Sequence, residues 1–380
     1  MRIGIEAQRI FREHKHGMDM VAIELIRNLQ VIDHQNEYFI FVNPDSDRSC
    51  FKPSSNFNLI EVKKSPYPLW EQFHLPKVVK QLNLDLLHCT SNTAPVNCPV
   101  PLLITLHDII YLEGKSHIAS GSWYQRLGNI YRIWNVPKVF RSATKIVTVS
   151  EFERSNIIQH FHCPPEKVET VYNGVSPHFK PQDQDTIKRV KETFHLPDQY
   201  LLFLGNTAPK KNLKGVLAAL KSLSDQNKLK IPLVMPDFGE ANLNRLLTEL
   251  NATELASMIH LTGYIPNQQL PGVYAGAAAF IYPSLRESFG LPILEAMACA
   301  CPVITSNNSS MIEIAENAAL LIDPFHPEEI AQAIDQVLTD KELAAGLIQN
   351  GVVRAKQFSY RKGAENINRL YYELYNSTRN

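Results

Sequence analysis

The stretch Glu287-Ser288-Phe289-Gly290-Leu291-Pro292-Ile293-Leu294-Glu295 decides how the second half of this chain folds. It lies between an apolar run, 277–282, and a helix-like run, 296–298, so it predicts a strand, a loop and the start of a helix. Pro292 suits the first helical position, where its missing N–H leaves no hydrogen bond unmade. The backbone N–H groups before it would then point at whatever lies above the helix, and such an N-terminus attracts a phosphate.

Two carboxylates flank this predicted phosphate position. Glu287 stands before the turn and Glu295 follows it in the expected first helical turn, so each can reach one side of a ligand. Neither should contact the phosphate, because like charges repel, and hydroxyl groups are their natural partners. A ligand with hydroxyls at both ends and a phosphate between them is a nucleotide sugar.

Short apolar strands alternate with helical patterns along both halves of the chain. The strands expected in the first half are 2–6, 38–42, 59–62, 84–88, 102–106 and 145–149. Those expected in the second half are 200–204, 232–235, 259–261, 278–282, 302–305 and 319–322. Each series predicts a doubly wound parallel sheet, so the fold class is α/β with two Rossmann-like domains. We place the domains at 1–177 and 178–360, with a final helix over 361–380, because Asn-Gly, prolines and polar residues cluster over 173–185.

The composition excludes several classes of protein. A chain of 380 residues is long for one domain and comfortable for two. Its 38 basic and 38 acidic residues cancel, so the broad basic surface of a nucleic-acid-binding protein is absent. The cysteines form no CxxC pair, which favours reduced thiols in a cytoplasmic protein. No signal peptide or membrane-length apolar run is visible, so we expect any membrane contact to be peripheral, at the inner face.

Two other strand ends carry candidate functional residues, at the edge where open α/β sheets bind ligands. Gly205, Asn206 and Lys211 follow the strand 200–204, and a lysine there can neutralise a diphosphate as a point charge. The alternative is a solvated lysine pair near a helix start, although cations are disfavoured at a helix N-terminus. His107 follows the strand 102–106 and can bond a sugar hydroxyl, whereas a lone histidine is more often structural.

The segment 115–145 is basic and aromatic. No acidic residue stands between Glu113 and Glu151, and lysines and arginines alternate there with tryptophans and tyrosines. Such a segment can rest on anionic lipid, or it can line a site for an acidic or lipid-phosphate acceptor. The alternative, to which we give more weight, is a surface helix whose aromatic face packs on the sheet.

Other familiar motifs are absent. No G-x-G-x-x-G follows the first strand of either half, no G-x-S-x-G occurs, and Ile109 stands where a P-loop requires glycine. Two Asp-x-Asp triplets, at 45–47 and 183–185, are explained by turn chemistry, so we expect no metal site.

Together these features resemble the retaining GT-B glycosyltransferases of glycosyltransferase family 4, over nearly the full length and with bacterial mannosyltransferase-like members in particular. The motifs that carry the resemblance are Glu287-x7-Glu295, Pro209-Lys210-Lys211-Asn212, Val149-Ser150-Glu151-Phe152, Val171-Tyr172-Asn173-Gly174-Val175 and Thr105-Leu106-His107-Asp108. Each is short, and their order and spacing make the combination specific.

The resemblance implies that the nucleotide sugar binds mainly to the C-terminal domain and the acceptor to the N-terminal one, with the final helix crossing back to the N-terminal domain. It assigns the donor sugar to Glu287, the ribose hydroxyls to Glu295, the leaving diphosphate to Lys211 and the face of the transferred sugar to His107. The predicted nucleotide-binding set is completed by Gly17, Gly205, Asn206, Tyr264, Ile265, Ser288, Phe289, Gly290 and Leu291. Asn206 departs from the family, which often has an arginine there, so Lys211 would carry more of the diphosphate charge.

The implied activity is retaining transfer of a hexosyl group from GDP-mannose or a UDP-sugar to a glycan or lipid-linked acceptor, without a metal, in cell-surface polysaccharide assembly. Two other classes stay open: a phosphorylase or epimerase on the same scaffold, and a non-catalytic partner subunit. The second requires losses at the site, whereas all four residues with assigned chemical roles are present.

Overall fold

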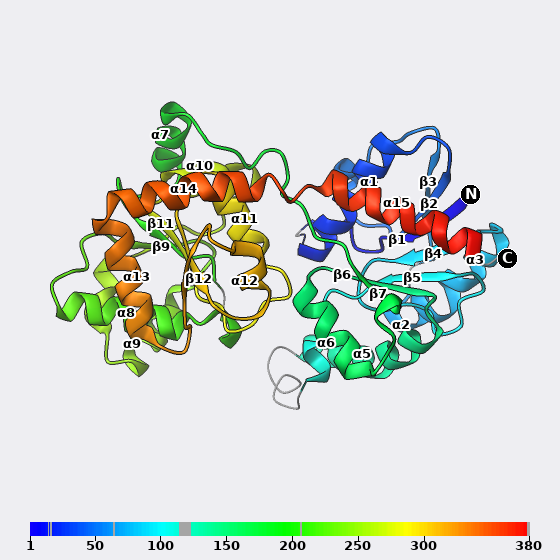
Figure 1. Cartoon of the computed structure of the whole chain (residues 1–380), viewed down its shortest axis with the longest axis horizontal. Coiled ribbons are helices and arrows are strands. Elements are labelled where there is room, and N and C mark those ends of the chain that lie inside the picture. Colours follow the sequence, from blue (N-terminus) through cyan, green and yellow to red (C-terminus); the bar gives the residue numbers. More distant parts are fainter. Residues whose placement is uncertain (14, 16, 64, 114–122, 206, 378–380) are drawn as a thin grey trace. The chain divides into compact units, whose positions relative to one another are not determined.

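A computed structural model describes residues 1–13, 15, 17–63, 65–113, 123–205 and 207–377 of the chain (Figure 1). The chain divides into two compact units. Unit 1 contains Met1–Gly174 and Tyr360–Asn380, and unit 2 contains Val175–Ser359. The final helix therefore belongs to the unit formed by the first half of the chain.

The described residues of unit 1 form a seven-stranded parallel sheet in the order β3-β2-β1-β4-β5-β6-β7. Its strands are β1 (Arg2–Glu6), β2 (Glu37–Val42), β3 (Phe57–Glu61), β4 (Leu86–Cys89), β5 (Leu102–Thr105), β6 (Lys145–Thr148) and β7 (Val168–Thr170). The direction of chain progression reverses between β1 and β4. Ligands of open α/β sheets bind at the carboxyl ends of strands beside such a reversal.

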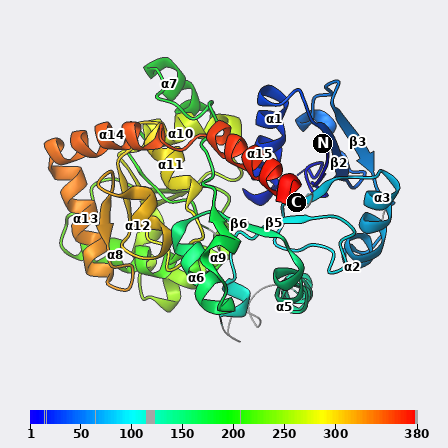
Figure 2. The ribbon, with the colours of Figure 1, turned by 45° about the vertical axis from the view of Figure 1, so that its right-hand side comes forward.

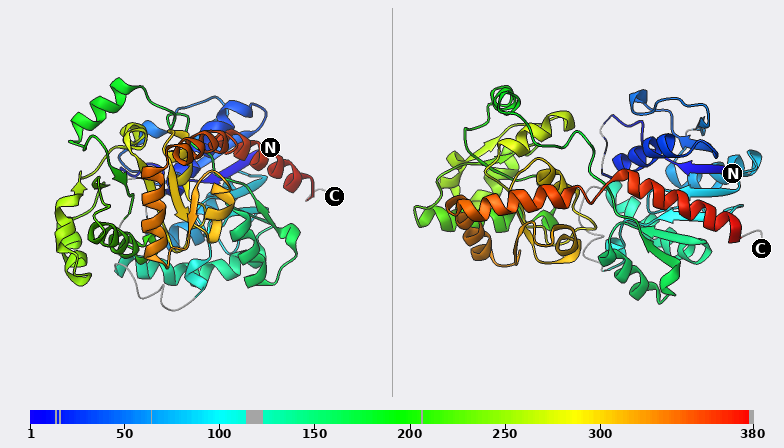
Figure 3. Two further views of the ribbon diagram at one scale, coloured as in Figure 1. Left: turned by 60° about the vertical axis from the view of Figure 1, so that its left-hand side comes forward. Right: turned by 45° about the horizontal axis from the view of Figure 1, so that its top comes forward.

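Helices cover both faces of this sheet, which explains why its strands are apolar on both sides. On one face, α1 (Gly17–Ile32) and α15 (Tyr360–Ser377) lie side by side, as the two views of Figure 3 show. The other face is covered by α3 (Leu75–Gln81), α5 (Trp123–Ser142) and α6 (Glu151–Phe161). The short helix α2 (Tyr67–Leu69) and a π-helical segment, Trp70–His74, lead into α3.

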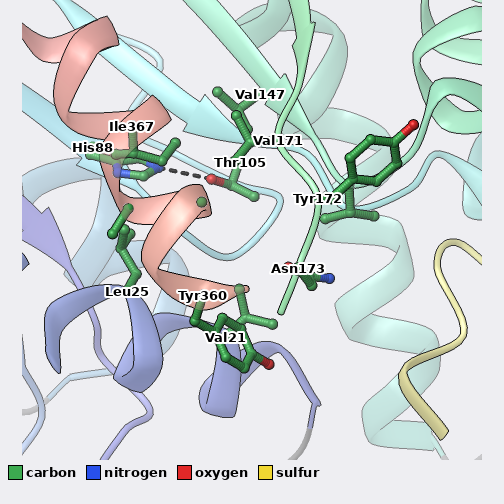
Figure 4. Close-up of a pocket in the computed structure, with 13 residues that line it drawn as sticks. Val21, Leu25, His88, Thr105, Val147, Val171, Tyr172, Asn173, Tyr360 and Ile367 are labelled. Atoms are coloured by element: carbon green, nitrogen blue, oxygen red, sulfur yellow. Dashed lines mark hydrogen bonds between the residues drawn. The ribbon is translucent and has the colours of Figure 1, made fainter. Parts of the chain in front are cut away.

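A buried polar contact attaches α15 to unit 1. His88 Nδ1 lies 2.8 Å from the Tyr371 hydroxyl and its Nε2 lies 2.8 Å from Thr105 Oγ1 (Figure 4). Burial lowers the pKa of His88 to about 3, so the imidazole is neutral. An apolar pocket under α15 adjoins this contact and contains none of the predicted site residues.

The described residues of unit 2 form a six-stranded parallel sheet in the order β10-β9-β8-β11-β12-β13. Its strands are β8 (Leu201–Leu202), β9 (Leu233–Met235), β10 (Ile259–Leu261), β11 (Ala279–Tyr282), β12 (Val303–Ser306) and β13 (Leu320–Ile322). The chain reverses between β8 and β11, so the carboxyl ends of these two strands mark the expected ligand position.

Unit 2 is also covered on both faces. On one face, α8 (Leu213–Asp225) and α13 (Pro327–Thr339) pack together (Figure 2). The remaining helices are α7 (Gln184–Thr193), α9 (Glu240–Glu249), α10 (Leu270–Gly276), α11 (Leu291–Ala298), α12 (Ser309–Ala315) and α14 (Lys341–Ala355). No helix in the described part of the chain is long and apolar enough to cross a membrane.

The predicted α/β class and the two parallel sheets are confirmed. Each expected strand has a counterpart, and the structure adds β7, which the sequence pattern did not predict. Val168–Thr170 contains three residues with Glu169 at its centre, so it shows neither alternation nor an apolar run. It forms the edge of the sheet by pairing with β6.

Candidate functional site

The loops after β8 and β11 meet at the strand reversal of unit 2. The first loop contains a short 3-10 turn, Pro209–Lys211, and the second contains Glu287. They are joined directly, because the Leu285 N–H donates to the Lys210 carbonyl oxygen over 2.7 Å. Lys211 and Glu287, both predicted site residues, are thus brought together from positions 76 residues apart.

Lys211 and Glu287 form a largely buried ion pair. Lys211 Nζ lies 2.7 Å from Glu287 Oε1, and the two side chains are 17% and 10% exposed. Lys210 Nζ lies 3.7 Å from the other carboxylate oxygen. The Tyr282 hydroxyl, at the end of β11, accepts a hydrogen bond from Lys211 over 2.6 Å.

The charges of the pair oppose the effect of burial. Burial raises the pKa of Glu287, but Lys211 and Lys210 outweigh it and hold that pKa below its usual value. Burial lowers the pKa of Lys211, while Glu287 raises it and Lys210 lowers it further. The unliganded site therefore holds one carboxylate beside two lysines, with an excess of positive charge.

The start of α12 fastens the loop that carries Glu287. The Ser310 hydroxyl lies within hydrogen-bond distance of the Glu287 and Phe289 carbonyl oxygens, 2.9 and 3.0 Å away. Ser309 Oγ accepts from the Glu287 N–H over 3.2 Å, and Asn308 donates to the Leu285 carbonyl oxygen. These bonds fix the backbone of the loop before any ligand arrives.

Helix α11 presents backbone donors beside the ion pair. The N–H groups of Gly290 and Leu291 find no acceptor among the residues that the structure describes. Gly290 has a φ of +99°, a backbone conformation that residues with a side chain rarely adopt, so glycine is needed for this turn. Orphan N–H groups and the positive end of a helix dipole form a site for an anion such as phosphate.

Gly205 also meets a steric requirement. A Cβ at this position would lie 2.0 Å from the Phe203 ring, so any other residue here would force that buried ring to move. Asn206, the next predicted residue, lies outside the described residues.

Glu295 lies deeper in α11 than the sequence predicted. The helix begins at Leu291, which makes Pro292 its second residue and places Glu295 beyond the first turn. Its Oε2 accepts a hydrogen bond from the Tyr274 hydroxyl over 3.1 Å. Burial raises the pKa of Glu295 to about 7, and this single bond offsets the effect only in part.

The other predicted residues of unit 2 have different settings. Ile265 is buried, whereas Tyr264 beside it is 64% exposed. Phe289 is buried with its ring edge against Phe358, and Ser288 is half-buried.

The predicted residues of unit 1 lie near the carboxyl edge of its sheet. His107 follows β5, is 6% exposed, and has Nε2 2.9 Å from the Thr90 carbonyl oxygen. Since a carbonyl only accepts, Nε2 carries the hydrogen and Nδ1 is the acceptor. Burial lowers the pKa of His107, which favours this neutral form. Gly17 is the exposed first residue of α1, and a Cβ there would meet nothing within 4 Å.

Sequence reasoning missed three residues that shape the unit 2 site: Tyr282, Tyr274 and Ser310. The tyrosines lie in strongly apolar segments, so they look like core residues. A weak signal was available for the serine, because Asn307-Asn308-Ser309-Ser310 is a polar run directly after a predicted strand. The part of the chain that the structure describes contains no cluster of His, Cys, Asp or Glu suited to a metal ion.

Two Rossmann-like units, one with a lysine pair and a helix N-terminus at its strand reversal, define a protein of the GT-B fold class. Models of two families match the chain: Glycosyltransferase Family 4 over residues 16–179 and Glycosyl transferases group 1 over residues 184–354. The chain belongs to the family 4 glycosyltransferases.

Sequence relatives agree with this family, and a solved structure shares the fold. The chain is 36% identical to the O-antigen chain mannosyltransferase B of Escherichia coli over 222 residues, 58% of each protein. It is 24% identical to the serotype-specific mannosyltransferase WbdA of Escherichia coli, over 75% of the chain but 35% of that relative. The crystal structure of HepE from Anabaena in complex with UDP and glucose matches with a TM-score of 0.74 at 17% identity, covering 98% of the chain and 99% of HepE. The chain thus spans less than two thirds of either relative's length, and the structural match shows a shared fold.

Proposed function

We propose that the protein is a retaining glycosyltransferase that moves a hexosyl group from a nucleotide-diphosphate sugar to a hydroxyl of a glycan or lipid-linked acceptor in cell-surface polysaccharide assembly. The observation that carries the proposal is the meeting of Lys211, Glu287 and the N-terminus of α11 at the strand reversal of unit 2. GDP-mannose is the preferred donor in this proposal, because the relatives at 36% and 24% identity are named mannosyltransferases. UDP-sugars are the second choice.

The chemistry follows from the charges of the site. As the bond between sugar and diphosphate breaks, negative charge grows on the diphosphate. Lys211 and the orphan N–H groups of Gly290 and Leu291 meet that charge without reorganising, which is electrostatic preorganisation. The acceptor hydroxyl attacks from the side of the leaving group, and a phosphate oxygen takes its proton. The anomeric configuration is then retained, and no metal takes part in the proposed step.

The remaining residues position the donor. Glu287 accepts from hydroxyls of the transferred sugar, and Glu295 accepts from the ribose hydroxyls. In unit 1, the Nδ1 of His107 has no partner among the described residues and can accept from a sugar hydroxyl. The glutamates act as hydrogen-bond acceptors that hold hydroxyls, and the lysine and helix end provide the stabilising charge.

Binding and transfer test the proposal together. We expect GDP or UDP, and the matching nucleotide sugars, to raise the melting temperature of the protein. A ligand at 100 times its Kd stabilises a protein by about 2.7 kcal/mol. Nucleotide diphosphate should be released only when an acceptor is present, which separates transfer from epimerase and phosphorylase reactions. If no nucleotide stabilises the protein, the proposal is wrong and the hypothesis of a non-catalytic partner subunit is favoured.

We further propose that α5 gives unit 1 a peripheral contact with anionic lipid. Val136, Val139 and Phe140 of α5 pack in the core. This agrees with the alternative interpretation of segment 115–145, a surface helix that packs on the sheet. Its outer face nevertheless exposes Leu127, Ile130 and Trp134 by 55%, 55% and 46%. Residues 115–122 of the predicted segment lie outside the described residues.

A segment that contacts α5 also exposes apolar side chains. Tyr67 and Tyr131 join α2 to α5 through ring centroids 5.8 Å apart. Leu69 and Phe73, which follow Tyr67, are 49% and 68% exposed. The single acidic residue between Glu61 and Asp85 is Glu71, which is fully buried, so the exposed charges of both segments are positive. A face of this composition complements an anionic bilayer.

Vesicle binding tests this contact. Each basic side chain near an anionic membrane contributes about 1 kcal/mol, so the double variant Lys138→Gln/Arg141→Gln should bind phosphatidylserine-containing vesicles about thirtyfold more weakly than the native protein. Ile130→Glu should also weaken binding, whereas Val353→Glu on α14, at a site of matching exposure (57%), should not. Equal binding to neutral vesicles, or unchanged binding of the variants, would contradict the proposed contact between α5 and anionic lipid.

A further inference from the structure

Tyr282 stands at the carboxyl end of β11, beside the two charged residues of the candidate site. It is 2% exposed, and its hydroxyl lies 2.6 Å from Lys211 Nζ. Burial and then the Glu287 carboxylate raise the pKa of this phenol, and Glu287 Oε1 lies 2.7 Å from Lys211 Nζ. The Lys211 ammonium therefore contacts both the phenol and the carboxylate.

The hydrogens of the Lys211 ammonium can be assigned. An ammonium has three hydrogens and no lone pair, and a phenol has one hydrogen and two lone pairs. The Tyr282 hydroxyl therefore accepts from Lys211. Two hydrogens of Lys211 are thus committed to Tyr282 and Glu287, and the third has no acceptor among the described residues.

We propose that Tyr282 is a positioning residue that orients Lys211, so that the third ammonium hydrogen is presented to a bound nucleotide diphosphate. This inference rests on the proposed function, since the diphosphate is the ligand that the function assigns to Lys211. It adds a residue to which neither the sequence motifs nor the proposed mechanism gave a role.

The electrostatics explain why a hydroxyl matters at this position. Burial and the neighbouring Lys210 both lower the pKa of Lys211, and Glu287 raises it. The Glu295 carboxylate, on α11, contributes to raising the pKa of the Tyr282 phenol. The Arg286 guanidinium donates to the Glu287 carbonyl oxygen. A phenylalanine would fill the same space but remove the acceptor that stabilises the ammonium. The Lys211 ammonium would then lose its proton at lower pH and would no longer be held in one direction.

The test compares Tyr282→Phe with Tyr200→Phe. Tyr200 is a suitable control because it is fully buried in the same unit and donates its hydroxyl hydrogen to the Val273 carbonyl oxygen over 2.6 Å, away from the charged pair. Binding of GDP and of UDP to the whole protein is measured by calorimetry from pH 6 to pH 10, with melting temperatures recorded alongside.

We expect Tyr282→Phe to bind the nucleotide diphosphate about tenfold more weakly at pH 7, as the loss of a hydrogen bond to a charged group predicts. Affinity falls at alkaline pH because the Lys211 ammonium loses its proton. In Tyr282→Phe this fall should begin about one pH unit lower than in the native protein. Tyr200→Phe should follow the native profile, even though it also loses a buried hydrogen bond.

Two other outcomes separate the inference from the proposed function. A Tyr282→Phe profile that coincides with those of the native protein and Tyr200→Phe would overturn the role of Tyr282, while the proposed function would stand. Absence of nucleotide binding by the native protein at every pH would overturn the proposed function, and this inference with it. In transfer assays, Tyr282→Phe should lower kcat more than it changes KM for the donor, because an oriented Lys211 matters most when charge develops on the diphosphate. A residue with only a structural role would not show this preference for the transition state.

Discussion

Replacing Lys211 with alanine will slow sugar transfer by about 10²–10³-fold, which is the effect typical of removing one donor from a preorganised anion site. The ammonium is the nearest cation to Glu287 and is only 17% exposed, so bulk water cannot replace it. Lys210 remains, but its Nζ lies 3.7 Å from Glu287 and its side chain is 43% exposed. Single-turnover kinetics with saturating donor will measure the loss. Lys214→Ala, which removes an exposed lysine paired with Glu249, should leave turnover unchanged.

The same substitution has a cost in stability that can be separated from its effect on turnover. Removing one partner of a fully buried ion pair costs about 3–5 kcal/mol, and the cost here should be smaller because Lys210 still lies beside Glu287. Adding Glu287→Gln to Lys211→Ala removes the unpaired carboxylate. The double variant should therefore recover stability without recovering transfer. Turnover that returns together with stability would mean that Lys211 has only a structural role.

The chemical groups of the unit 2 site could be predicted because they lie where parallel strands end. Sequence alone locates such positions when an apolar run stops at a polar residue, and both Lys211 and Glu287 follow runs of that kind. That the two residues touch could not be predicted, because it depends on β8 and β11 being neighbours although β9 and β10 lie between them in sequence.

The hydroxyl partners of the site were hidden for a different reason. The strands of unit 2 are apolar on both faces, so no alternation shows which way Tyr282 points. The depth of Glu295 was misjudged because the helix starts one residue before Pro292, which a proline signal alone does not fix. These details depend on side-chain packing and on the first residue of a single helix. Sequence periodicity determines neither of them.

The affinity for nucleotide diphosphate will fall as pH is lowered below about 7, and Glu295 is the cause. In the free protein, burial raises the pKa of this carboxyl to about 7, and Tyr274 supplies its single hydrogen bond among the described residues. Ribose hydroxyls that donate to the carboxylate would favour its charged form and lower that pKa in the complex. Binding then releases a proton, so affinity is greatest above pH 7 and weakens by up to about tenfold per pH unit below it.

Calorimetry in buffers of different ionisation enthalpy will show this proton release directly, and Glu295→Gln will show where it originates. The glutamine keeps a hydrogen-bonding side chain beside Tyr274 but has no proton to exchange, so its affinity should vary less between pH 5.5 and pH 8. The terminal phosphate of the nucleotide titrates near pH 6 and will leave a residual slope, which is common to both proteins and cancels in their difference. Glu249→Gln, at an exposed carboxylate paired with Lys214, serves as the matched control and should keep the native pH profile. If Glu295→Gln retains the full native dependence on pH, the ribose contact lies elsewhere and the raised pKa of Glu295 is a feature of the core alone.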